Sequence, residues 1–167
     1  MSAAPRAVCI IPARGGSKRL PGKNVRPFRG RAMVCRSIDA ARASGVFDTV
    51  MVSTDAPAIT AFAREAGAEV PFLRSAAAAS DHATTAEVLR EVLERYAETG
   101  TNFETACCLY PTAPFVEADD LARGRGLLLE SAFDVVMPVA AFSYPIWRSL
   151  DRDSEGRVRL NFPDNLN

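Results

Sequence analysis

Residues 7–24 read AVCIIPARGGSKRLPGKN, an apolar run followed by a loop rich in glycine, proline and cations. The apolar run has the length of a β-strand, and its lack of alternation indicates burial on both faces of a sheet. The runs TVMVS at 49–53 and TACCLY at 105–110 have the same character. Helical patterns separate the three runs, so strand and helix alternate along the chain. This order predicts an α/β fold, a three-layer α/β/α sandwich with a mainly parallel sheet.

Residues that begin or end helices mark the helical segments. Gly45 and Gly67 fit C-terminal ends, and Thr84 with Glu87 fits a capping-box start. We therefore expect helices at 32–44, 57–66, 84–98 and 117–130. We expect further strands at 69–73, 133–139 and 157–162, the last after a tight turn at 153–156. In such a sheet, ligands bind beyond the carboxyl ends of the strands.

Composition narrows the class of protein. The chain has 167 residues, enough for one buried core, and carries 20 cations and 20 acids. The balanced charge gives no reason to bind nucleic acid or an acidic membrane. The chain has no apolar run of the roughly 18 residues that a membrane helix needs and no signal peptide, so we expect a cytoplasmic protein. The four cysteines form no CxxC pair and are expected to be reduced, and the single His82 disfavours zinc sites and Ser-His-Asp hydrolases.

The charges are unevenly distributed along the chain. The first 38 residues hold nine of the 20 cations and no acid, because the first acidic residue is Asp39. This end of the protein therefore favours anions, and a nucleoside triphosphate is the natural candidate. The alternative is a basic surface that later carboxylates neutralise across the fold.

The loop after the first strand offers groups that bind phosphate. Gly15 and Gly16 let backbone amides approach an anion closely, and Arg14 and Lys23 add charge-assisted hydrogen bonds. The loop is not a Walker A motif, which would have glycine in place of Ser17, and it lacks the third glycine of the dinucleotide fingerprint. The alternative is a surface loop of glycine and proline that carries several cations.

The stretch IPARGGSKRLPGKN at 11–24 resembles the opening motif of the bacterial CMP-sugar synthetases, the cytidylyltransferases that activate nonulosonic (sialic-type) acids. The resemblance continues in order and spacing through most of the chain. The matching stretches are FDTVMVSTD at 47–55, GAEVPFLR at 67–74, SDHATT at 80–85 and YPTAPF at 110–115. The stretches SYPIWRSL at 143–150 and FPDNLN at 162–167 are similar to the pseudaminic acid branch of this family.

This resemblance implies roles for individual residues. It implies that Arg14 and Lys23 are catalytic and hold the triphosphate. The implied nucleotide-binding residues are Gly15, Gly16 and Ser17 along the phosphates, Asn24 near the ribose and phosphates, and Arg74, Ala83 and Thr85 around the cytosine. Tyr110 stands where sialic acid synthetases carry Gln, so it is expected to bind a different sugar, with a core aromatic position as the alternative.

The resemblance also implies a fold of the nucleotide-diphospho-sugar transferase type and a reaction. CTP and a nine-carbon sugar acid, with pseudaminic acid favoured, would give the CMP-sugar and pyrophosphate, with Mg²⁺ bridging phosphate oxygens. The protein would be a homodimer, with residues 1–142 as the nucleotide-binding core and residues 143–167 as the start of a dimerisation and sugar-site segment. The metal ligands are unknown, because the family's metal-binding carboxylates lie in a later segment and the chain looks truncated.

Other functions stay open at this point. The chain could be a catalytically silent, truncated nucleotide-binding fragment. It could also perform the same reaction on sialic, legionaminic or 3-deoxy-octulosonic acid.

Several of these residues also have purely structural explanations. Asp55 fits a helix cap, and Arg74 fits a surface ion pair with Glu69. Thr84 is explained as a helix N-cap, which leaves Thr85 as the hydroxyl available to a ligand.

Overall fold

A computed structural model describes residues 6–18, 20–141, 143 and 145–165. Contacts between residues divide the chain into two units, Met1–Asp134 and Val135–Asn167. The boundary expected between residues 142 and 143 falls inside the second unit. In the described part of the chain, no helix has the length and apolar character needed to cross a membrane.

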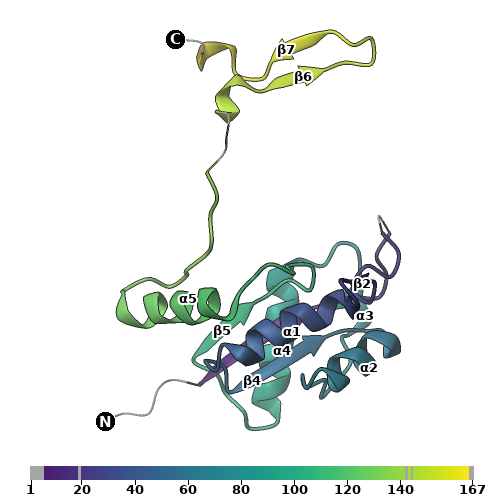
Figure 1. The fold of residues 1–167 in the computed structure, drawn as a ribbon, viewed down its shortest axis with the longest axis vertical. Coiled ribbons are helices and arrows are strands. Elements are labelled where there is room, and N and C mark those ends of the chain that lie inside the picture. The colour runs from purple at the N-terminus through teal and green to yellow at the C-terminus, as the bar shows by residue number, and fades with distance from the viewer. Residues whose placement is uncertain (1–5, 19, 142, 144, 166–167) are drawn as a thin grey trace. The chain divides into compact units, whose positions relative to one another are not determined.

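The first unit is built on a parallel sheet with the strand order β4–β1–β5 (Figure 1). The central strand β1 (Ala7–Pro12) pairs with β4 (Thr49–Ser53) on one side and with β5 (Thr105–Cys108) on the other. These strands confirm the three apolar runs as strands, and their parallel direction confirms the prediction from the alternating pattern.

Helices cover both faces of this sheet. The helices of the unit are α1 (Met33–Ala43), α2 (Pro57–Glu65), α3 (Ala76–Ala79), α4 (Thr85–Glu98) and α5 (Ala118–Glu130). Figure 1 shows α1 in front of the strands and α4 behind them. Successive side chains of a strand point to opposite faces, so Cys9 and Ile11 pack on the α1 side while Val8 and Ile10 pack on the α4 side. The three layers of the predicted sandwich are confirmed, and burial on both faces explains the unbroken apolar run of β1.

Local sequence sets the ends of the helices. The Thr84 hydroxyl accepts a hydrogen bond from the Glu87 amide, and the Glu87 carboxylate accepts one from the Thr84 amide, which completes the predicted capping box of α4. Gly45 and Gly67 follow α1 and α2 with φ angles of 66° and 81°. This left-handed conformation ends helices and is accessible to glycine without steric cost.

Short elements complete the two units. In the first unit, β2 (Pro27–Phe28) and β3 (Arg31–Ala32) form an antiparallel hairpin before α1. In the second unit, β6 (Leu150–Arg152) and β7 (Val158–Leu160) form another, joined by the predicted turn. The second unit also contains the 3₁₀ helices η1 (Ile146–Arg148) and η2 (Pro163–Asn165). β7 confirms the strand expected at 157–162, whereas the sequence analysis misses β2, β3 and β6.

The strand expected at 133–139 is wrong. These residues form no strand in the structure, and Met137 and Val139 are exposed rather than buried. A strand exists only through its paired neighbours, and within the described residues this segment has none. Pro138 also lacks an amide that could join a ladder. A short apolar run therefore predicts burial only where a neighbouring strand is available.

The strand expected at 69–73 is reduced to a single parallel bridge between Met51 and Glu69. Pro71 has no amide to donate to a continued ladder, and the backbone bends after it. The chain returns to the sheet at Arg74, whose amide donates to the carbonyl oxygen of Thr54 (2.8 Å).

Candidate active site

The loop that leaves the carboxyl end of β1 is fastened at both ends. The Ala13 amide donates to the carbonyl oxygen of Ser53 (2.9 Å), which holds the start of the loop against the end of β4. The side-chain amide of Asn24 donates to the carbonyl oxygen of Arg14 (3.0 Å). The carbonyl oxygen of Asn24 accepts from the Val34 amide (2.8 Å). Asn24 is therefore buried between the loop and α1, where it joins the two arms of the loop.

Asp55, the second residue after β4, holds Gly15 of the loop. Its Oδ1 accepts a hydrogen bond from the Gly15 amide (2.8 Å). A Cβ atom on Gly15 would lie 2.8 Å from the Cβ of Ala56, so only glycine allows this approach to α2. Asp55 does not cap α2, because the N-cap is Ala56, whose amide donates to the Thr54 hydroxyl (3.1 Å). The explanation of Asp55 as a helix cap is wrong.

A cavity of about 130 Å³ lies between the loop and the start of α2. The residues that line it are Arg14, Gly15, Gly22, Lys23, Asn24, Val25, Ala56, Ala58 and Ile59. The Oδ1 atom of Asn24 is buried and has no hydrogen-bond partner among the described residues. The N-terminus of α2 has no side-chain cap, and uncapped helix N-termini favour anions. The cavity therefore combines cations and a helix N-terminus.

Arg14 and Lys18 both contact the carboxylate of Asp81. Nη1 of Arg14 donates to Oδ1 of Asp81 (2.8 Å) and to the carbonyl oxygen of Ser80 (3.2 Å), and Nζ of Lys18 pairs with Oδ2 of Asp81. Lys18 and, second to it, Arg14 hold the pKa of the Asp81 carboxyl below its ordinary value. The loop after β1 is thereby tied to the turn that precedes α4.

Arg74 lies buried at the carboxyl end of β4. Its Nε donates to the hydroxyl of Ser53 (3.0 Å), and its Nη2 donates to the carbonyl oxygen of Ser53 (2.7 Å). Burial lowers the pKa of the Arg74 guanidinium, and the two hydrogen bonds compensate part of the cost of burying the charge. The alternative of a surface pair with Glu69 is wrong, because Glu69 accepts from the hydroxyl of Tyr96 instead (3.2 Å).

Thr85 and Tyr110 meet at the carboxyl end of β5. Their hydroxyl oxygens are 3.0 Å apart, and either can donate. Tyr110 is 55% exposed, so the alternative of a core aromatic position is wrong. The Ser37 hydroxyl donates to the carbonyl oxygen of Tyr110 (3.0 Å), which fixes its backbone to α1. The residues expected at the cytosine and at the sugar are therefore neighbours.

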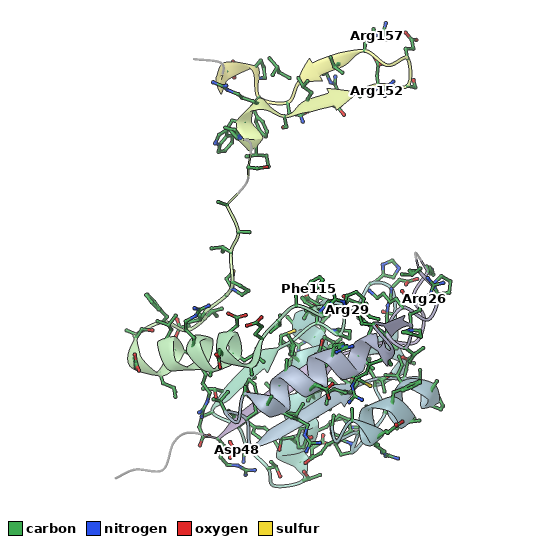
Figure 2. All side chains as sticks on the ribbon, viewed as in Figure 1. Arg26, Arg29, Asp48, Phe115, Arg152 and Arg157 are labelled. Atoms are coloured by element: carbon green, nitrogen blue, oxygen red, sulfur yellow. The ribbon has the colours of Figure 1, made fainter. Side chains whose placement is uncertain are left out.

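The hairpin β2–β3 adds further cations to this end of the unit. Figure 2 shows Arg29 near Phe115, whose ring packs edge to face on Phe28 at 5.7 Å between ring centroids. Asp48 lies at the opposite end of the sheet, where its carboxylate accepts from the first amide of β1 (2.7 Å).

The structure brings the expected site residues together in two groups. Arg14, Gly15, Lys23 and Asn24 line the cavity, while Gly16, Ser17 and Arg74 are not among its lining residues. Ala83, Thr85 and Tyr110 form the second group, which the contact of Arg14 with Asp81 joins to the loop. The amide of Gly15 is already bonded to Asp55, so of the glycine pair the Gly16 amide is the one left for a phosphate.

From the sequence, Asp55 fits a helix cap or a catalytic base and Asp81 has no assigned role, so the contacts of both with the loop are not expected. Their partners lie 40 and 67 residues away in the chain, so no local pattern reveals the contacts. The only available signal is that both residues lie inside the stretches STD and SDHATT, which carry the family resemblance.

The described residues do not form a protein metal site by themselves. No three His, Cys, Asp or Glu side chains among them come together as a metal-binding group. The expected Mg²⁺ therefore has no assigned protein ligands among the described residues.

A family model described as "Cytidylyltransferase" matches residues 8–141. The chain belongs to the cytidylyltransferase family. This cytidylyltransferase is 34% identical to the pseudaminic acid cytidylyltransferase of Campylobacter jejuni over 153 residues, 92% of the chain and 66% of that protein. It is 33% identical over 154 residues to the CMP-N,N'-diacetyllegionaminic acid synthase of Legionella pneumophila, again with 92% and 66% covered. The chain thus spans about two thirds of the length of these relatives.

A solved structure shares the fold of this cytidylyltransferase. It is that of CMP:2-keto-3-deoxy-manno-octonic acid synthetase complexed with CTP, with a TM-score of 0.63 and 26% identity over 76% of this chain and 49% of that one. These comparisons confirm the family resemblance and the nucleotidyltransferase type of fold predicted from the sequence.

Proposed function

We propose that this cytidylyltransferase transfers CMP from CTP to a nonulosonic acid and releases pyrophosphate. One observation carries the proposal: Arg14, Gly15, Lys23 and Asn24, which the family motif assigns to the nucleotide, line one cavity at the carboxyl end of β1. Parallel α/β sheets bind ligands at this edge. Membership of the cytidylyltransferase family supports cytidine as the base.

The proposed reaction is an in-line substitution at the α-phosphorus. The anomeric hydroxyl oxygen of the sugar forms a bond to this phosphorus, the bond to the bridging oxygen of pyrophosphate breaks, and the hydroxyl proton is released. Such a step needs alignment and neutralised phosphate charge more than a protein nucleophile. Arg14 and Lys23 would supply the positive charge, and Asn24, which lines the same cavity, would contact the nucleotide near its ribose and phosphates.

Pseudaminic acid is the favoured acceptor. The stretches at 143–150 and 162–167 resemble the pseudaminic acid branch, a pseudaminic acid cytidylyltransferase is 34% identical to this chain, and Tyr110 replaces the Gln that sialic acid synthetases carry. The exposed ring of Tyr110 beside Thr85 would distinguish the acceptor through its shape and its hydroxyl. Binding of Mg²⁺ through the phosphates, assembly as a homodimer and a cytoplasmic location are parts of the same proposal.

The second candidate is a nucleotide-binding fragment without activity. Pyrophosphate release separates the two candidates. Protein of verified intact mass is incubated with CTP, Mg²⁺ and, in turn, pseudaminic, legionaminic, sialic and 3-deoxy-octulosonic acid. Release with pseudaminic acid and CTP, but not with UTP or ATP, supports the enzyme. Binding of CTP without release supports the fragment, and absence of CTP binding contradicts both.

Lys23→Ala tests the role proposed for the Lys23 side chain in this reaction. Lys23 lines the cavity and has no ion-pair partner among the described residues, so its loss should change the unfolding midpoint little. Loss of one charge-assisted phosphate contact should lower turnover by about 100-fold or more. Arg90→Ala removes an exposed cation of α4 as the control and should leave turnover unchanged. Parallel loss of stability and activity in Lys23→Ala would contradict the role of Lys23.

A further inference from the structure

Asp81 is placed where it can organise the candidate site without belonging to either expected group of ligand contacts. Each of its carboxylate oxygens takes one cation of the loop, Oδ1 from Arg14 and Oδ2 from Lys18. These partners come from a segment more than 60 residues earlier in the chain. Asp81 therefore bridges the phosphate-binding loop and the turn that carries Ala83 and Thr85.

The contact leaves part of Arg14 free for a ligand. Among the described residues, both hydrogen bonds of the Arg14 guanidinium use Nη1, one to Asp81 and one to the carbonyl oxygen of Ser80. The guanidinium is planar, so fixing one nitrogen from two sides also fixes the direction of Nε and Nη2. This remaining edge has the spacing that holds two oxygens of a phosphate.

The other side of Asp81 is anchored to the sheet. The carbonyl oxygen of Ser80 accepts from the Ala83 amide (3.4 Å), and Thr84 then caps α4. Val92 and Tyr96 of α4 pack on the face of β1 that carries Val8 and Ile10. Arg14 is therefore held in a fixed direction relative to α4. The first residue of this helix, Thr85, is the one expected to contact the cytosine.

We propose that Asp81 is a positioning residue, which aims Arg14 at the triphosphate and keeps the phosphate loop in register with the cytosine-binding turn. The inference rests on the proposed function, because it requires a nucleotide that spans both parts of the site. Because Arg14 is already held in place before CTP binds, its side chain loses less conformational entropy on binding. Exposed ion pairs contribute little to stability, so variants at this exposed carboxylate should fold.

The experiment compares CTP, which would span both parts of the site, with tripolyphosphate, which carries no base. CTP and tripolyphosphate are titrated calorimetrically into the wild-type chain, Asp81→Asn and Asp39→Asn. Asp39 also pairs with an arginine, Arg31 (2.6 Å), and is similarly exposed, so its variant is matched for charge. Asp81→Asn should weaken CTP binding by about three- to tenfold and weaken tripolyphosphate binding less, because only CTP also contacts the cytosine-binding turn. Asp39→Asn should leave both affinities unchanged.

If Asp81 opposes nucleotide binding, its substitution should raise the affinity for CTP instead of lowering it. If its carboxylate merely competes with phosphate for Arg14 and Lys18, Asp81→Asn binds both ligands more tightly, and the proposal is overturned. Equal CTP affinity in the wild type and Asp81→Asn also overturns it while leaving the proposed function intact. A wild-type chain that does not bind CTP overturns both.

Two further measurements test whether Asp81 acts through Arg14. In the Arg14→Gln background, Asp81→Asn should have a smaller effect on CTP affinity than in the wild type, because the Arg14 contact is already gone and only the Lys18 contact remains. Without any ligand, the ¹⁵N signal of Arg14 Nε should be sharp in the wild type and broadened in Asp81→Asn. Asp81→Glu, which keeps the carboxylate, should restore part of the CTP affinity. An unchanged Nε signal, or an additive effect in the double variant, contradicts a positioning role.

Discussion

Gly15 and Gly16 are neighbours in one motif but meet different surroundings. Gly15 lies against Ala56 and gives its amide to Asp55, whereas a Cβ atom on Gly16 would meet no atom within 4 Å. The sequence offers no way to separate the two, because both simply indicate a loop that approaches a ligand. In the structure, Gly15 serves the packing of the loop on α2, and Gly16 keeps an open surface.

Alanine substitution should separate these two roles. Gly15→Ala forces its new methyl group to within 2.8 Å of Ala56, so the loop or the start of α2 must shift. We expect the free energy of unfolding to fall by about 1–3 kcal/mol. Gly16→Ala, the matched control, should change it by less than about 0.5 kcal/mol. Urea unfolding followed by circular dichroism measures both, and equal losses would show that the contact with Ala56 is not the cause.

At the scale of residues, the sequence predicts which side chains matter better than it predicts what they touch. Arg14, Lys23 and Asn24 are identified from the loop motif, and the structure places them around one cavity. The contacts of Asp55 and Asp81 cannot be predicted, because they depend on how distant segments meet in three dimensions.

At the scale of helices and strands, long periodic patterns and caps are predicted well. The capping box of α4 and the glycine ends of α1 and α2 are local, so the sequence contains all the information needed. The strands β2 and β3 have two residues each and carry no detectable period. The segment 133–139 fails for the opposite reason, because its apolar pattern is clear but the required neighbouring strand is missing from the described residues.

The capping box of α4 makes part of the stability depend on pH. Hydrogen bonds from the Thr84 amide and, second, from the Thr84 hydroxyl hold the pKa of Glu87 below its ordinary value of 4.5. A carboxyl with a depressed pKa stabilises the fold fully above its ordinary pKa, and this contribution disappears as the pH falls through the lower, folded-state pKa. The wild type should therefore exceed Glu87→Gln in stability at pH 6, and the difference should shrink towards pH 3.

Urea unfolding at pH 6 and at pH 3 tests this expectation. Glu94→Gln, on the exposed face of the same helix, is the control and should keep a constant offset from the wild type. A Glu87→Gln offset that stays constant or grows towards pH 3 would contradict the assignment of this pH dependence to the helix cap.

The two units of the chain differ in how extensively their side chains are packed. The first unit has a core packed on both faces of its sheet. The second, Val135–Asn167, has a short hairpin and an edge-to-face contact between Trp147 and Phe162, at 5.3 Å between ring centroids. Its described residues up to 141 form no helix or strand and are exposed.

Limited proteolysis should reflect this division. Chymotrypsin at low concentration should cut first between residues 133 and 147, because this stretch offers Phe133 and Trp147 as exposed targets without a strand or helix around Phe133. Mass spectrometry should then show a resistant fragment that contains β1 to α5. A first cut near Tyr96 or Phe103, inside the packed layers, would contradict the division.

The central place of β1 has a consequence for biosynthesis. Both neighbours of this strand come later in the chain, β4 at 49–53 and β5 at 105–108. As the nascent chain leaves the ribosome, the second edge of β1 stays unpaired until β5, which ends at residue 108, has emerged. During that interval the unpaired edge is open to wrong partners, and chaperones that shield such segments would act on this chain while translation is still under way.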